Sequence, residues 1–81
     1  MKAHVYVTLK HTVLDAQGKT VADALRRMSY ASVSDVRQGK YFLLTFENNV
    51  ESDTAHAETE RIAREVLTNP VIEEFTFDIE P

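Results

Sequence analysis

Three histidines, His4, His11 and His56, are the residues of this 81-residue chain best suited to act as general bases or metal ligands. No two of them are four residues apart, and the chain has no cysteine, so no short metal-binding motif is present. No serine–histidine–aspartate arrangement or phosphate-binding glycine loop stands out either. The sequence therefore predicts neither a metal site nor a catalytic residue set.

The turn formed by Arg37, Gly39 and Lys40 concentrates positive charge on a few residues. Such a turn suits a solvated hairpin tip, and it suits contact with an acidic partner or an anionic ligand equally well. The whole chain carries thirteen acidic and nine basic residues, for a net charge of −4, which argues against binding nucleic acid. The chemistry of the sequence thus favours binding over catalysis.

Length and composition predict one domain over residues 1–81. A chain this short buries only about 60–65% of its unfolded surface, and association is a common way to stabilise it. The opening residues are too polar for a signal peptide, and no apolar run is long enough to span a bilayer. We therefore expect a cytoplasmic protein with no contact to membranes.

The elements that position these residues begin with a strand at residues 3–10, where apolar and polar side chains alternate. A helix follows, because apolar residues recur at spacings of 4, 3, 4 and 3: Leu14, Gly18, Val21, Leu25 and Met28. Asp15 is the expected N-cap. Gly18 in the first turn predicts close approach of the helix backbone to its own sheet or to a partner.

Two further strands are expected at residues 34–38 and 40–47, with Gly39 between them. Val36 must share a face with Phe42, Leu44 and Phe46, which requires a loop of odd length. The loop Arg37-Gln38-Gly39, with Gly39 in the left-handed conformation, satisfies this requirement.

A second helix is indicated by a stripe that ends before Asn69-Pro70 and comprises Ala55, Thr59, Ile62 and Val66, widened by Ala63 and Leu67. Residues 71–79 then alternate as a strand, with Glu73 as a charged exception on the apolar face. The order βαββαβ predicts an α+β, ferredoxin-like sandwich, with a four-stranded, mostly antiparallel sheet and two helices on one face. The other face is too apolar for water, so we expect self-association through Tyr6, Tyr41, Leu43 and Ile72.

Three blocks of the chain resemble the PurS family: VYVTLKHTVLDAQG at residues 5–18, VSDVRQGKYFLLTFE at 33–47 and LTNPVIEEFTFDIE at 67–80. They occur in the order and spacing of the family. One departure is Ala16, where the family commonly has proline at the first helical position.

The resemblance implies the small, non-catalytic subunit of phosphoribosylformylglycinamidine synthase, an enzyme of purine biosynthesis. It implies a homodimer or tetramer that joins a glutaminase subunit to a synthetase subunit and supports ammonia transfer. The complex would use ATP and Mg²⁺, with no cofactor in this subunit. The residues expected to contact those partners are Lys10, Leu14, Asp15, Gln17, Gly18, Arg37 and Lys40.

Three other protein classes share the βαββαβ order. The main alternative is an ACT-like regulatory module, which would need a small-molecule site at an interface. An RNA-recognition module would need exposed aromatic residues beside cations, whereas Phe42 and Phe46 are expected in the core. An acylphosphatase-like enzyme would need an arginine and an asparagine at a phosphate-binding loop, which the sequence does not offer.

Overall fold

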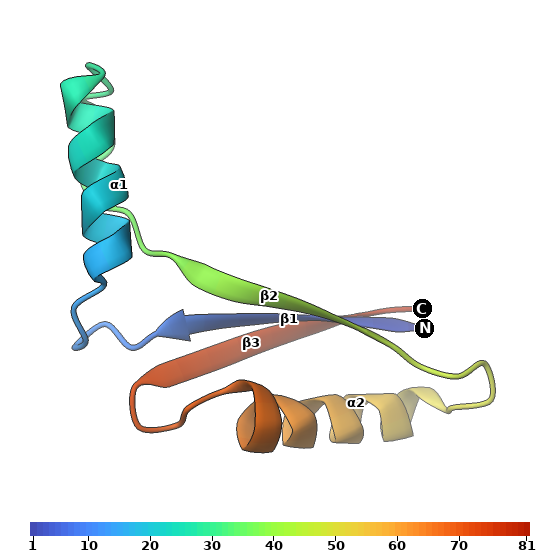
Figure 1. Ribbon diagram of the computed structural model, residues 1–81. Helices are drawn as coiled ribbons and strands as arrows, with labels where there is room; N and C mark the ends of the chain where they lie inside the picture. Colours follow the sequence, from blue (N-terminus) through green and yellow to red (C-terminus); the bar gives the residue numbers. More distant parts are fainter.

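A computed structural model describes all 81 residues as a three-stranded antiparallel sheet with one helix beside it and one helix projecting from its end (Figure 1). The strand order is β2-β1-β3. The elements in chain order are β1 (Lys2–Leu9), α1 (Ala16–Arg27), β2 (Gly39–Thr45), α2 (Ser52–Ile62), the π-helical turn η1 (Ala63–Leu67) and β3 (Glu73–Glu80). The helices are too short and too polar to serve as transmembrane spans.

The core lies between the sheet and the segment formed by α2 and η1. Val5 of the central strand is fully buried, opposite Phe42 of β2 and Phe77 of β3. Val5, Val7 and Ala63 form the buried centre, against which the following residues pack: Phe42, Leu44, Leu67, Phe75 and Phe77. Phe42 and Leu44 thus share the core face, as their alternation predicts, whereas Val36 lies outside the sheet.

The π-helical turn changes which residues of the second helix meet the sheet. Ala55, Thr59 and Ala63 are buried, whereas Val66 is 74% exposed. The wider turn at residues 63–67 rotates the end of the helix, so Leu67 packs on the core and Val66 points outward. The predicted helical stripe is therefore wrong at Val66.

The predicted fourth strand, residues 34–38, is absent, and so is the predicted hairpin turn. Gly39 begins β2 opposite Thr8 instead of reversing the chain, and its φ is not positive. A Cβ at this position would lie 2.5 Å from the Val7 carbonyl oxygen. Gly39 is therefore needed for close strand contact, and residues 34–38 run on from β2 away from the sheet.

The second correction concerns α1, which does not cover the sheet. Residues 10–38, here called the arm, lead out from the end of β1, through α1, and back to the start of β2 (Figure 1). The molecule measures 51 × 26 × 13 Å with a radius of gyration of 16.1 Å, whereas a compact chain of this length has about 12 Å. The two helices therefore do not lie together on one face.

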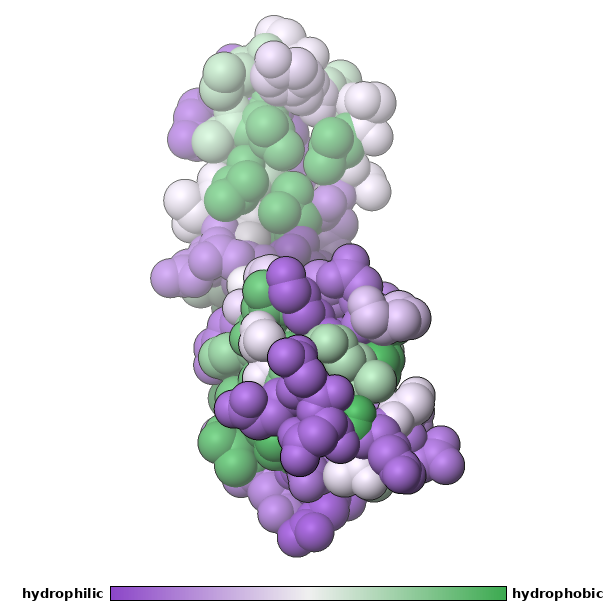
Figure 2. Space-filling model, turned by 90° about the vertical axis from the view of Figure 1, so that its right-hand side faces the viewer, coloured by the Kyte–Doolittle hydropathy of each residue, from purple (hydrophilic) through white to green (hydrophobic).

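The extended shape leaves an unusually large surface. The accessible area is 5991 Å², against roughly 4,900 Å² for a compact protein of this mass. Apolar residues of the arm account for part of the difference, since Leu14, Val21, Met28 and Tyr30 are 42–75% exposed. Figure 2 shows apolar side chains gathered on the arm, above the more hydrophilic surface of the sheet region.

Candidate functional site

Asp15 joins the two ends of the arm where the arm leaves the sheet. As the N-cap of α1, it accepts a hydrogen bond at Oδ1 from the Gly18 backbone N–H at 2.9 Å, as the sequence predicts. Its Oδ2 accepts from the Gln38 backbone N–H at 2.6 Å. These bonds, led by the one from Gly18, lower the pKa of the Asp15 carboxyl below its ordinary value, and the nearby Arg37 guanidinium adds to the effect.

Arg37 provides a second connection at the base of the arm. Its Nη2 donates to two carbonyl oxygens, those of Lys10 and Val13, each at 2.9 Å. The guanidinium is partly buried in these contacts, so the long side chain ties the segment before β2 to the loop after β1. The cation is thus used within the chain and is not at a solvated hairpin tip.

Gly18 explains why α1 and the returning segment can lie so close together. A Cβ on Gly18 would collide with the Val36 carbonyl oxygen and lie 2.7 Å from Asp15 Oδ2. The predicted close approach is confirmed, but the neighbour is the backbone of the arm itself. Higher up, Arg26 Nη2 donates to the Ser34 carbonyl oxygen at 2.9 Å, which secures the same pairing.

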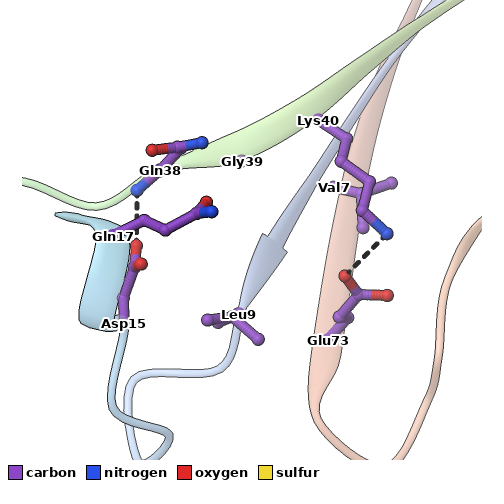
Figure 3. A pocket seen from close by; sticks show the side chains of 8 residues that line it. All are labelled: Val7, Leu9, Asp15, Gln17, Gln38, Gly39, Lys40 and Glu73. Atoms are coloured by element: carbon purple, nitrogen blue, oxygen red, sulfur yellow. Dashed lines mark hydrogen bonds and ion pairs between the residues drawn. The ribbon is translucent and has the colours of Figure 1, made fainter.

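A pocket of about 230 Å³ lies between the base of the arm and the sheet (Figure 3). Its lining consists of Val7, Leu9, Asp15, Gln17, Gln38, Gly39, Lys40 and Glu73. Val7 and Leu9 provide an apolar surface in the middle, and the amide side chains of Gln17 and Gln38 lie on the side of the arm. The combination suits a small polar group or a side chain from another protein.

Glu73 and Lys40 form the opposite side of this pocket. Lys40 Nζ lies 3.3 Å from Glu73 Oε2, and the Asn69 backbone N–H donates to Glu73 Oε1 at 2.8 Å. The bond from Asn69, with Lys40 in support, lowers the pKa of the Glu73 carboxyl. The charged exception in the last strand is therefore explained, because Glu73 has two partners at the uncovered end of the sheet.

The residues predicted to contact partners fall into two groups. Lys10, Asp15, Gly18, Arg37 and Lys40 all have partners within the chain, since Lys10 Nζ also donates to the Pro70 carbonyl oxygen at 2.7 Å. Leu14 and Gln17 are exposed, Leu14 to 75%. The structure brings the turn residues together, while their contact with another protein stays a prediction.

The residues predicted for self-association are all exposed on or beside the sheet. Tyr6, Tyr41, Leu43 and Ile72 are 38–53% accessible. Tyr6 and Tyr41 face each other across β1 and β2, with ring centroids 5.5 Å apart. His4, not predicted for this surface, joins them through a 2.6 Å hydrogen bond between its Nδ1 and the Tyr41 hydroxyl.

Sequence reasoning missed the arm as an exposed apolar surface. Val21 and Met28 were expected in the core, because a helical stripe shows that a face must be buried but not what buries it. Tyr30, next to the left-handed Ser29 that follows the helix, had no such pattern. No three metal-binding side chains cluster.

Comparison with known proteins gives concordant matches over nearly the whole chain. The family model "PurS: Phosphoribosylformylglycinamidine (FGAM) synthase" matches residues 2–81. The phosphoribosylformylglycinamidine synthase subunit PurS of Bacillus subtilis is 40% identical over 79 residues, which are 98% of this chain and 92% of that protein. Its counterpart in Mycobacterium leprae is 41% identical over 75 residues, covering 93% and 90%.

Solved structures of PurS proteins have a similar fold. A crystal structure of the Bacillus subtilis protein has a TM-score of 0.80 at 41% identity and covers 99% of this chain and 98% of that one. A chain in the structure of PurLQS from Thermotoga maritima has a TM-score of 0.77 at 28% identity, with 95% and 93% covered.

Proposed function

This chain belongs to the PurS family, whose members are subunits of phosphoribosylformylglycinamidine synthase in purine biosynthesis, and we propose that it links the glutaminase and synthetase subunits of that enzyme. The chain itself would be non-catalytic and would support the passage of ammonia from one catalytic subunit to the other. Holding two sites in a fixed relation shortens the path on which ammonia can be lost or protonated.

The observation that carries this proposal is the surplus of exposed apolar surface on a chain without a catalytic residue set. Two separate apolar surfaces, one on the arm and one on the sheet, are exposed on 81 residues. Large exposed apolar patches mark interfaces with other proteins. The similarity to a chain of the Thermotoga maritima PurLQS structure supports partners of the same two kinds.

We assign the contact with a catalytic subunit to the base of the arm. Leu14 and Gln17 are exposed there and would touch the partner directly. Asp15 and Gly18 would act by holding that surface in place, as would Lys10, Arg37 and Lys40. In a variant with Leu14→Asp and Gln17→Ala, we expect weaker co-elution with the catalytic subunits while self-association persists. Unchanged co-elution would contradict this assignment.

Self-association would use both apolar surfaces. The excess of about 1,000 Å² over a compact chain is close to the area that each partner buries in a standard protein–protein interface, about 800 Å². We propose that the arm, through Val21, Met28 and Tyr30, is covered by a second copy in a homodimer. The surface of Tyr6, Tyr41, Leu43 and Ile72 would then join two dimers into a tetramer.

The proposed division of labour places ATP and Mg²⁺ in the synthetase subunit, with no cofactor in this chain. Its carboxylates at the pocket, Asp15 and Glu73, already accept hydrogen bonds from backbone N–H groups, and no third metal ligand joins them. Neither nucleic acid nor a membrane is an expected partner, and the cytoplasm is the expected compartment.

Reconstitution tests the linking role. The matching glutaminase and synthetase are assayed with and without this chain, first with glutamine and then with ammonium salt as the nitrogen source. We expect glutamine-dependent activity to need the chain and ammonia-dependent activity to need it little. Equal dependence in both assays would contradict a role in transfer, and dependence in neither would contradict membership of the working complex.

A further inference from the structure

One flank of α2 and η1 carries an open groove of about 260 Å³ that none of the interfaces proposed above uses. The groove is lined by Glu58, Arg61, Ile62, Glu65 and Val66. These residues lie three or four positions apart, so they share one flank of the helix. Small-molecule sites are clefts of about 300–1,000 Å³ that enclose most of the ligand, so this smaller, open groove better suits side chains of another protein.

The π-helical turn gives the groove its exposed apolar side chain. In a regular α-helix, Val66 would continue the stripe of Ile62 toward the sheet. The wider turn at residues 63–67 directs Val66 outward, to 74% exposure, while Ile62 stays half-buried. Such π-helical turns are rare and are frequently found at functional sites. The irregular turn thus places an apolar side chain in solvent, beside a groove.

The charged rim of the groove decides which kind of partner fits. Glu58, Arg61 and Glu65 make no ion pair within the chain. A neighbouring pair on the same helix, Glu60 and Arg64, is joined at 2.8 Å. Two carboxylates against one guanidinium leave the rim acidic, and packing the groove on that of a second copy would bring like charges together. The rim therefore suits a different protein, one with an apolar side chain flanked by basic residues.

We propose that the groove binds the second of the two catalytic subunits, through an aliphatic side chain that lysine or arginine flanks on that subunit. The inference rests on the linking role proposed above, because a chain that joins two subunits needs a separate surface for each. The base of the arm, with exposed Leu14 and Gln17, provides one surface. The groove shares no residue with the pocket at that base, so both subunits can bind at once.

The absence of cysteine allows a single photoreactive label per chain. A benzophenone maleimide is attached to Val66→Cys in the groove, to Leu14→Cys at the base of the arm, or to the control Ala57→Cys, which is exposed on α2 outside the groove. Each labelled chain is irradiated with the glutaminase and synthetase during turnover. We expect residue 66 to crosslink to one catalytic subunit and residue 14 to the other, with little product from residue 57.

Three crosslinking results would contradict the groove as the second contact. Residue 66 could crosslink to a second copy of this chain, to the same catalytic subunit as residue 14, or no more than the control at residue 57. Each of them shows that the groove does not bind the second catalytic subunit.

Val66→Lys and Ala57→Lys add the same charge to exposed positions of one helix, inside and outside the groove. With Val66→Lys, we expect the concentration of this chain that half-restores glutamine-dependent activity to rise at least about tenfold. Ala57→Lys should change it by less than about twofold, as for an ordinary surface substitution. Circular dichroism confirms that both chains fold, and equal effects of the two folded variants would contradict the proposal.

The acidic rim is tested with Glu58→Gln and Glu65→Gln combined, against Glu47→Gln and Glu60→Gln at exposed positions elsewhere. The groove variant should raise the half-restoring concentration about three- to tenfold at low salt and less at high salt, because salt screens exposed charges. A groove variant that matches its control would contradict a basic partner. A chain that restores no glutamine-dependent activity contradicts the linking role, while the crosslink from residue 66 still decides what the groove binds.

Discussion

At the scale of single residues, polar contacts hold the base of the arm, and a glycine leaves room for two of its backbone segments to lie close together. Asp15 accepts hydrogen bonds from the backbone N–H groups of residues 18 and 38, and Arg37 donates to the carbonyl oxygens of residues 10 and 13. Because Gly18 has no side chain, it also lets two backbones approach closely. These positions belong to the blocks that resemble the PurS family, and the structure gives them internal roles that orient the exposed residues between them.

Gly18→Ala tests the close backbone approach. Alanine is the better helix former by about 1 kcal/mol, so a helix free of other contacts would gain stability. Here the added methyl collides with the Val36 carbonyl, and we expect a net loss of about 1–3 kcal/mol in the free energy of unfolding, measured with urea. The neighbouring exposed Lys19→Ala should change it by less than about 0.5 kcal/mol.

Acid should weaken the base of the arm through Asp15 and Glu73, whose carboxyl pKa values are lowered by folding from ordinary values of 3.8 and 4.5. The stabilisation is fully present above the unfolded pKa values and is lost as the pH falls through the folded ones. We expect the free energy of unfolding to decline below pH 4.5. Asp15→Asn should make that decline shallower in urea titrations at stepped pH, and an unchanged slope would contradict the role of Asp15.

At the scale of elements, the end of the second helix shows how a local irregularity changes packing. The π-helical turn at residues 63–67 directs Leu67 onto the sheet and leaves Val66 in solvent. Directly after it, Thr68 is buried to 92%, and its hydroxyl has no hydrogen-bond partner. A buried polar atom without a partner costs stability.

Thr68→Val should therefore stabilise the fold by about 1 kcal/mol, because it removes the unpaired hydroxyl and preserves the shape of the side chain. Thr59→Val is the matched control. The Thr59 hydroxyl is also buried but donates to the Ala55 carbonyl oxygen at 2.7 Å, so its loss should be neutral or destabilising. Thermal unfolding of both variants provides the comparison, and a less stable Thr68→Val would show that the hydroxyl has a partner in solution.

The elements were predictable where the signal is local. Alternation located the first and last strands of the chain, expected at residues 3–10 and 71–79 and found at Lys2–Leu9 and Glu73–Glu80. The cap at Asp15 was predictable too, because it joins residues three apart. The second bond of Asp15, to Gln38, spans 23 positions, and no spacing rule reveals it. Residues 34–38 contain a single apolar residue, Val36, so the sequence could not say whether this segment pairs with the sheet.

At the scale of the whole molecule, the separation of the arm from the sheet governs what the chain can do alone. Only ten of the 81 residues are buried, too few for a robust isolated fold of this size. Exposed apolar side chains gather on the arm and on the sheet, which lie apart in Figure 1. A chain built this way can offer different surfaces to different partners at once.

Val21→Lys together with Met28→Lys tests the arm as a dimer surface. Both side chains are exposed, Val21 on α1 and Met28 at its C-cap, so the monomer should fold as before, whereas two lysines buried in an interface would lack partners. We expect the dimer dissociation constant to rise more than about a hundredfold in sedimentation velocity. Thr20→Lys, exposed on the same helix, should have little effect. An unchanged dimer would move the interface away from the arm.

The central position of β1 has a consequence for the time course of folding. Lys2 pairs with Thr45 on one side and with Glu80 on the other, so every strand pair of the sheet joins distant parts of the chain and none is a local hairpin. Loop closure must precede any gain from strand pairing, which places refolding in the range of milliseconds to seconds, accessible to stopped-flow fluorescence of the tyrosines. During synthesis on the ribosome, β1 and β2 can pair early, but one edge of β1 stays open until residues 73–80 have emerged.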